Sequence, residues 1–124
     1  MQSLLPALLL VSSISLLGCA KHSDGCKKSA DLKGPFAELG LPTEEGNGRV
    51  CEADDKKIKV EHTGTDGDRW RDKYEEAVLG HGYTKKDCSK TQCVYVKGKA
   101  RIRVNVLELA KKWTTVIVED YPEK

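Results

Sequence analysis

The sequence lacks the motifs of the common enzyme classes. It contains no glycine-rich phosphate loop and no G-x-S-x-G nucleophile turn. Its three histidines, His22, His62 and His81, stand in no catalytic or metal-binding spacing. Adjacent acids such as Asp54 and Asp55 point in different directions along a strand, so they do not form an acid–base pair. We therefore predict that the protein is not an enzyme and has no cofactor and no metal site.

A strong excess of charge of one sign is also lacking. The chain has 21 Lys and Arg against 19 Asp and Glu, for a net charge of +2. Proteins that bind nucleic acid usually present a pronounced basic surface. We therefore expect no nucleic-acid partner.

No apolar run is long enough to span a bilayer comfortably. The apolar stretch 4–17 carries no charged residue. A spanning helix needs about 20 apolar residues, whereas the hydrophobic region of a signal peptide has about 7 to 15. The stretch therefore predicts export through a signal peptide in residues 1–18.

Leu16, Leu17, Gly18 and Cys19 end this apolar stretch. The four residues resemble the lipobox of bacterial lipoproteins, and the resemblance covers the first nineteen residues. It implies cleavage before Cys19 and attachment of diacylglycerol to the Cys19 thiol. The positive charge usual at the start of such a signal is supplied here by the amino terminus alone.

The acyl chains implied for Cys19 would attach the protein stably, because each buried methylene contributes about 0.8 kcal/mol and two chains suffice. Ala20, directly after the cysteine, resembles an outer-membrane sorting signal of Gram-negative lipoproteins. The resemblance therefore implies a lipid-anchored protein of the cell envelope, at the outer membrane rather than the inner one. The alternative is an ordinary cleaved signal peptide, with Cys19 as a disulfide partner.

Four more cysteines, Cys26, Cys51, Cys88 and Cys93, lie in the mature part. An even number in an exported protein is typical of two disulfides, and four cysteines allow three pairings. Cys88 and Cys93 flank a short stretch typical of a hairpin loop, so we favour that pair, and Cys26–Cys51 follows by exclusion. A zinc site is the rival, but the spacing is not the C-x₂-C type.

The mature chain divides into two parts. Residues 19–45 are polar and turn-rich without periodicity, which predicts a lipidated N-terminus and a flexible tether, with 36–42 packing loosely on the domain. Residues 46–124 predict a single domain. Alternation and β-forming residues predict strands at 49–53, 56–62, 83–87, 93–97, 100–107 and 113–121.

The segment 68–79 predicts the one helix. Trp70, Tyr74, Ala77 and Val78 form an apolar stripe at i, i+4, i+7 and i+8, which is more typical of core than of a ligand groove. Short connections favour antiparallel neighbours, so we expect an α+β fold of two layers, one helix on an antiparallel sheet. We expect three or four strands after the helix. With three, the order of elements is ββαβββ. This order resembles that of small envelope lipoproteins whose function is not known.

Four cations are candidate ligand-binding residues. Lys57 and Lys59 lie on one predicted strand, and Arg101 and Arg103 lie on another. The two-residue period of a strand points all four away from the helix. If the two strands are close, the cations form a face for an anionic polymer or another anionic envelope component. The alternative is an ordinary solvated face.

Two classes of function remain. The first is a membrane-anchored, non-catalytic binding or assembly module whose partner is a protein, glycan or lipid head group of the envelope. The second is an inhibitor or immunity-type protein that caps another exported protein, because small, charged, disulfide-held domains suit that role. An exposed apolar patch would favour a protein partner, and an open basic face would favour an anionic polymer.

Overall fold

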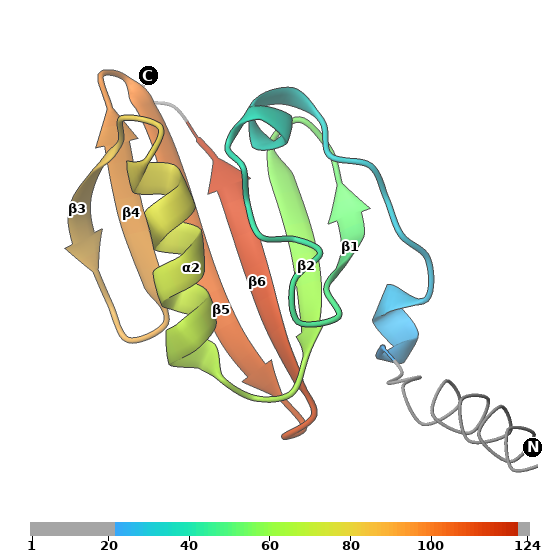
Figure 1. The fold of residues 1–124 in the computed structure, drawn as a ribbon. Helices are drawn as coiled ribbons and strands as arrows, with labels where there is room; N and C mark the ends of the chain where they lie inside the picture. The colour runs from blue at the N-terminus through green and yellow to red at the C-terminus, as the bar shows by residue number, and fades with distance from the viewer. Residues whose placement is uncertain (1–21, 122–124) are drawn as a thin grey trace, which may run out of the picture.

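The computed structural model describes residues 22–121, which form two layers (Figure 1). A six-stranded antiparallel sheet carries one α-helix on one side, so the predicted α+β class is confirmed. The predicted signal peptide and the lipobox-like residues, with Cys19, lie outside the described residues. Between residues 22 and 121, no helix is long and apolar enough to cross a membrane.

Six strands make up the sheet, in the order β1-β2-β6-β5-β4-β3. The last strand, β6, therefore lies in the middle of the sheet. It joins the β1–β2 hairpin on one side to β5, β4 and β3 on the other. Four strands follow the helix, so the shorter form ββαβββ was wrong. All five residues of edge strand β3 are exposed, which explains its weak apolar signal. The strands are β1 Arg49–Ala53, β2 Lys57–Thr63, β3 Thr84–Cys88, β4 Gln92–Lys97, β5 Ala100–Leu109 and β6 Trp113–Asp120.

Helix α2, Gly67–Leu79, covers the half of the sheet that contains β4, β5 and β6 (Figure 1). Its N-cap is Asp66, whose side chain accepts a hydrogen bond from the backbone N–H of Arg69 at 3.3 Å. This satisfies one of the unpaired amides that every helix start presents. The buried residues of the predicted stripe are Trp70, Tyr74 and Val78.

The described part of the expected tether, residues 22–45, is packed against the sheet. Short helix η2, Gly34–Glu38, places Phe36 in the core with no exposed surface. Leu39 and Leu41 join the same core. Figure 1 shows η2 and the loop that follows it passing over the strands on the side that carries α2. The prediction of a flexible tether is therefore wrong for these residues, because they cover a part of the sheet that the single helix leaves open.

Both predicted disulfides are present. Cys26–Cys51 joins short helix η1, Asp24–Cys26, to β1. Cys88–Cys93 joins β3 to β4 at the end of their hairpin. The first bond therefore fixes the start of the described chain, and the second fixes an exposed edge strand.

The hairpin between β5 and β6 ends in an unusual tight turn. The backbone N–H of Lys112 donates to the carbonyl of Leu109 at 3.1 Å. The two central residues, Ala110 and Lys111, have φ of 53° and 54°. Turns of this kind normally use Asn-Gly, because a left-handed conformation costs other residues about 1–2 kcal/mol each. The turn is therefore strained, and it presents exposed lysines at its tip.

Candidate functional site on the open face of the sheet

The face of the sheet opposite α2 is the candidate functional surface, and we call it the open face. Ile58 and Val60 of β2 are fully buried toward the core. Strand alternation therefore turns Lys57, Lys59 and Glu61 to the other side. The same alternation, with the pairing of the strands, adds Val94, Val96, Arg101, Arg103, Asn105, Leu107, Leu109, Trp113, Thr115, Ile117 and Glu119.

The four predicted cations lie on this open face, but acidic side chains lie between them. Strand β6 separates β2 from β5, so Lys57, Glu119 and Arg103 form a row across three strands. The Nε atom of Arg103 lies 3.1 Å from a carboxylate oxygen of Glu119. The Nζ atom of Lys59 lies 3.7 Å from a carboxylate oxygen of Glu52. Ion pairs therefore engage at least Lys59 and Arg103, and the four cations do not form an uninterrupted basic cluster.

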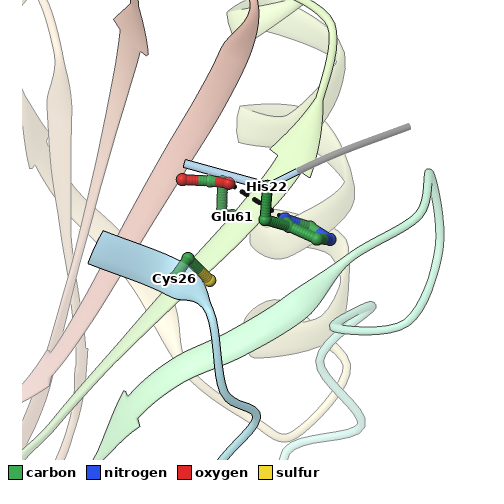
Figure 2. A group of neighbouring side chains, drawn as sticks. All are labelled: His22, Cys26 and Glu61. Atoms are coloured by element: carbon green, nitrogen blue, oxygen red, sulfur yellow. Dashed lines mark hydrogen bonds and ion pairs between the residues drawn. The ribbon is translucent and has the colours of Figure 1, made fainter. Parts of the chain in front are cut away.

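A buried carboxylate also lies on the open face. Glu61 is only 1% exposed, and Figure 2 shows His22 lying against it. His22 Nδ1 lies 2.9 Å from Oε1, and the backbone N–H of Ser23 donates to the same oxygen at 2.7 Å. The Ser23 hydroxyl donates to Oε2.

Burial opposes ionisation of Glu61, but the hydrogen bonds from Ser23 and His22 outweigh it. The pKa of the Glu61 carboxyl therefore lies below its usual value. A carboxylate that is buried and ionised is stable only with such partners. Glu61 thus holds the chain at residues 22–23 against the open face.

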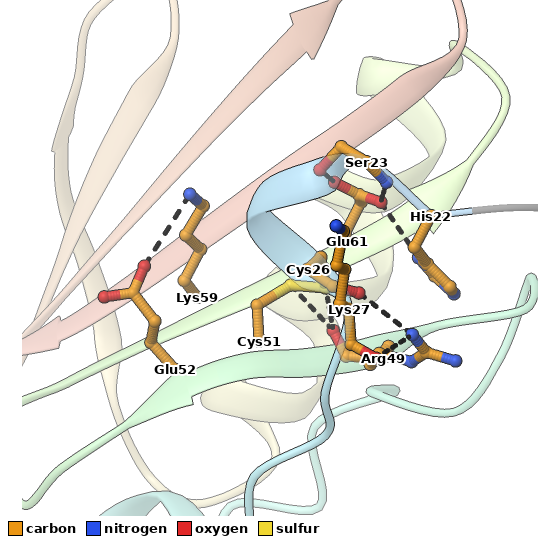
Figure 3. Close-up of a disulfide and its surroundings, with 9 residues drawn as sticks. All are labelled: His22, Ser23, Cys26, Lys27, Arg49, Cys51, Glu52, Lys59 and Glu61. Atoms are coloured by element: carbon orange, nitrogen blue, oxygen red, sulfur yellow. Dashed lines mark hydrogen bonds and ion pairs between the residues drawn. A yellow bond between two sulfur atoms is a disulfide. The ribbon is translucent and has the colours of Figure 1, made fainter.

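Two further contacts fasten the same segment to the sheet (Figure 3). The guanidinium of Arg49 donates to the carbonyl oxygens of Cys26 at 2.9 Å and Lys27 at 3.0 Å. The Cys26–Cys51 disulfide lies beside these hydrogen bonds. We call Glu61, Arg49 and this disulfide, together with residues 22–27, the N-terminal clamp.

His22, Cys26 and Glu61 offer one ligand atom each, and these atoms lie within 4.8 Å of one another (Figure 2). Nitrogen, sulfur and oxygen are all ligands that zinc accepts. However, a cysteine binds metal as a thiolate, and the sulfur of Cys26 is bonded to Cys51. The Glu61 oxygens already contact Ser23 and His22. We therefore interpret the three residues as a structural junction.

His62 lies on the helix side, in the core. Its ring is stacked on Trp70, with centroids 3.7 Å apart. Nδ1 lies 2.7 Å from the carbonyl oxygen of Glu45, and Nε2 lies 2.9 Å from the hydroxyl of Tyr74. Since a carbonyl only accepts, we assign the proton to Nδ1, and Nε2 accepts from the tyrosine. Both nitrogens are occupied, so His62 is a structural residue.

Protonation of His62 should make stability depend on pH. Burial lowers the pKa of His62 from 6.5 to about 4, although the hydrogen bond to Glu45 opposes this shift. His62 therefore takes up a proton below about pH 6.5 in the unfolded chain but only below about pH 4 in the folded chain. Stability should be complete above pH 6.5 and should fall by up to about 3 kcal/mol as the pH drops to about 4. Denaturant unfolding at neutral pH and near pH 4 measures this loss.

The control for this prediction is His62→Gln, which removes the titrating group. The variant should be less stable at neutral pH, but it should lose less stability on acidification than the wild-type chain. An equal loss in both proteins would contradict the assignment to His62. Acidic groups elsewhere affect both chains alike, so the difference isolates the histidine.

Two surface hollows lie at the periphery of the molecule. One of about 470 Å³ lies between residues 29–32 and β1. The other, of about 270 Å³, lies beside the end of α2 and is lined in part by His81. His81 Nδ1 lies 3.0 Å from the carbonyl oxygen of Ala77, an interaction common for a histidine at a helix end. Neither hollow contains a recognisable catalytic arrangement among its lining residues.

Two polar atoms on the open face are left unsatisfied. Asn105 Oδ1 and Thr115 Oγ1 are buried and have no hydrogen-bond partner within residues 22–121. A buried polar atom without a partner costs about 1–3 kcal/mol. Together with the cations, these atoms make the open face the best candidate for a binding surface in the described part of the chain.

Sequence reasoning missed the N-terminal clamp. Glu61 stood out only as an acid on a strand face that otherwise carries Lys57 and Lys59. Ser23 and His22 lie in a polar segment without periodicity, so nothing local linked them to β2. Comparison with models of known protein families, with curated proteins and with solved structures finds no match for the chain. The site is therefore interpreted from its own geometry.

Proposed function

We propose that the chain is a cell-envelope lipoprotein, anchored by lipid on Cys19, whose disulfide-bonded domain binds rather than catalyses. The observation that carries this proposal is the N-terminal clamp. It begins at His22, and only Ala20 and Lys21 separate that residue from the lipobox cysteine. The clamp thus holds the chain against the sheet from the third residue after the proposed lipid site. With Ala20 after the cysteine, we propose the outer membrane as the location.

A clamp so close to an anchor has a mechanical meaning. A flexible tether would let the domain turn freely above the membrane, whereas a clamped start restricts its orientation. Removing a carboxylate from water is costly unless partners compensate it. Burying Glu61 costs free energy, and this cost would serve no purpose if the position of residues 22–23 did not matter. The buried Glu61 therefore supports a role for the clamp in orienting the domain above the membrane.

We propose no catalysis. His22 contacts Glu61, His62 contacts Tyr74, and His81 contacts a helix carbonyl. Among the described residues, each imidazole thus has a structural partner. What supports binding instead is the open face, with its cations and its two unsatisfied polar atoms.

A protein partner is the second candidate, in line with an inhibitor or immunity-type role. The open face carries half-buried apolar side chains among its charges, including Val94, Leu107 and Ile117. Mixed apolar and charged surfaces are typical of protein interfaces. A pull-down of the mature domain from envelope extract, compared with an Ile117→Glu variant, tests this candidate. Capture of one stoichiometric partner that the variant loses would favour it over an anionic polymer.

The anchor is tested by Cys19→Ser. The wild-type protein should label with fatty acid and partition into detergent, because the acyl chains on Cys19 supply the apolar surface. The variant should lose both properties and remain in the aqueous phase. Unchanged detergent partitioning in the variant would refute the anchor. A Cys88→Ser, Cys93→Ser protein is the control, since it also loses cysteine residues but should still carry the lipid.

A further inference from the structure

We propose that the tip of the β5–β6 hairpin inserts into the interfacial layer of the anchoring membrane, among anionic lipid head groups. The residues concerned are Leu107, Leu109, Lys111, Lys112 and Trp113, and we call them the membrane-contact patch. This inference rests on the lipid anchor proposed above. It adds which surface of the domain lies against the bilayer.

The patch lies beside the N-terminal clamp. Glu61, which holds His22 and Ser23, is paired with Thr115 across the sheet. Thr115 is in turn paired with Leu107. Trp113 lies two residues before Thr115 on β6, on the same face. It is therefore a diagonal neighbour of the two strand partners of Thr115, Glu61 and Leu107, at about 7–8 Å. Figure 1 shows the β5–β6 turn and η1 at the same end of the sheet.

The proposed lipid must leave the protein near this patch. Three Cα–Cα steps separate His22 from Cys19. Each step spans 3.8 Å, so the two Cα atoms lie at most about 11 Å apart, whatever path the chain takes. The acyl chains would therefore enter the bilayer close to the clamp and to the hairpin tip.

The chemistry of the patch suits a membrane interface. Leu109 is 43% exposed, and Trp113 is partly exposed. Tryptophan favours the head-group level of a bilayer because its ring is apolar and its N–H is polar. Lys111 and Lys112 are exposed beside it, with Lys112 Nζ 5.7 Å from the Trp113 ring centroid. Lysines at this position attract anionic head groups while their stems lie along apolar surface.

The strained turn fits the same role. Ala110 and Lys111 adopt left-handed backbone conformations where Asn-Gly would be relaxed. Strain of this kind tends to persist at functional positions. Here it places two lysines and an exposed leucine at the tip of the hairpin.

The two tryptophans of the chain, Trp70 and Trp113, provide the test. In a Trp70→Phe variant, Trp113 is the only tryptophan. The lipidated protein is reconstituted into phosphatidylglycerol-containing vesicles whose acyl chains are brominated, and the fluorescence is compared with unbrominated vesicles. We expect quenching of about twofold and a blue shift, because interfacial tryptophan lies within reach of the acyl chains.

The matched variant is Trp113→Phe, which leaves Trp70 as the only tryptophan. Trp70 is 2% exposed in the core on the other side of the sheet, so its fluorescence should not be quenched. If Trp70→Phe does not fold, loss of quenching between the wild-type protein and Trp113→Phe gives the same answer. Equal quenching of both tryptophans, or none of Trp113, would overturn the proposal.

Two leucine variants test the location of contact. Among the described residues, the exposed large apolar side chains are Leu109 and Leu79, at 43% and 39%. Leu109→Glu should abolish the quenching of Trp113, whereas Leu79→Glu, at the far end of α2, should leave it unchanged. Retention of quenching in Leu109→Glu would contradict insertion of the tip.

Vesicle flotation distinguishes failure of the membrane-contact patch from failure of the proposed lipid anchor on Cys19. Protein that floats with the vesicles but shows no quenching of Trp113 is anchored in another orientation, and only the patch is refuted. Protein that does not float refutes the anchor and the patch together. Undiminished quenching in purely phosphatidylcholine vesicles would refute the role of anionic head groups.

Discussion

Trp70→Ala should destabilise the domain by about 3–5 kcal/mol, the range for truncating a buried aromatic side chain. Trp70 is 2% exposed, and its ring stacks on His62 at 3.7 Å. Removal of the indole would leave a cavity between α2 and β2. It would also leave the imidazole, which is fixed by Glu45 and Tyr74, without its stacking partner.

The packing around Trp70 leaves little room for the cavity to close. A Cβ atom placed on Gly46, which has φ of 58°, would lie 2.3 Å from the indole. The loop thus approaches the ring as closely as a glycine permits. We expect limited relaxation after the truncation and a cost toward the upper end of the range.

Equilibrium unfolding in denaturant measures this effect. Asp72→Ala, on the exposed side of the same helix, is the control and should change stability by less than about 0.5 kcal/mol. A loss below about 1 kcal/mol for Trp70→Ala would mean that the ring contributes little to the core. The described packing of α2 on the sheet would then be wrong.

The two disulfides should differ in their contribution to stability. The Cys26–Cys51 loop has a sequence separation of 25 and the Cys88–Cys93 loop one of 5. A chain-entropy estimate gives about 3.5 kcal/mol for the longer loop and about 2 kcal/mol for the shorter one. Replacing both cysteines of the longer loop by alanine should therefore lower the melting temperature more.

The N-terminal clamp should increase this difference. Without Cys26–Cys51, residues 22–27 would lose this covalent link to β1 and would rely on non-covalent contacts such as those of Glu61 and Arg49. The Cys88–Cys93 bond joins an edge strand whose residues are all exposed, so its loss affects less packing. Thermal unfolding of the two double variants decides the order. A larger drop for the Cys88, Cys93 variant would contradict it.

Regular periodicity accounts for the parts of the fold that could be predicted. Ile58 and Val60 alternate with lysines on β2, and Ile102 and Val104 alternate with arginines on β5. The helix stripe repeats every three to four residues. In each case the buried face follows from local spacing alone, and the observed burial agrees.

Non-local packing accounts for what could not be predicted. Phe36, Leu39 and Leu41 are spaced three and two residues apart, which fits neither helix nor strand. The sequence predicts loose packing for them, yet they lie in the core because a single helix cannot cover six strands. Their burial depends on the size of the sheet, which no local pattern records.

The same reason limits prediction of the candidate site. Alternation correctly placed Lys57 and Arg103 on one face, but strand order decides what lies between them. Strand β6, the last in the sequence, brings Glu119 into that row. The contact of Ser23 with Glu61 likewise joins residues 38 positions apart. Such a contact follows only from the assembled sheet.

The most direct test of a clamped, lipid-anchored domain is the intact mass of the protein recovered from membranes of an expressing bacterium. The account predicts a chain that begins at Cys19, lacks residues 1–18 and carries a diacylglycerol, with or without a further acyl group. Its other four cysteines should be oxidised. A chain that retains residues 1–18, or one that begins elsewhere with an unmodified Cys19, would contradict the account.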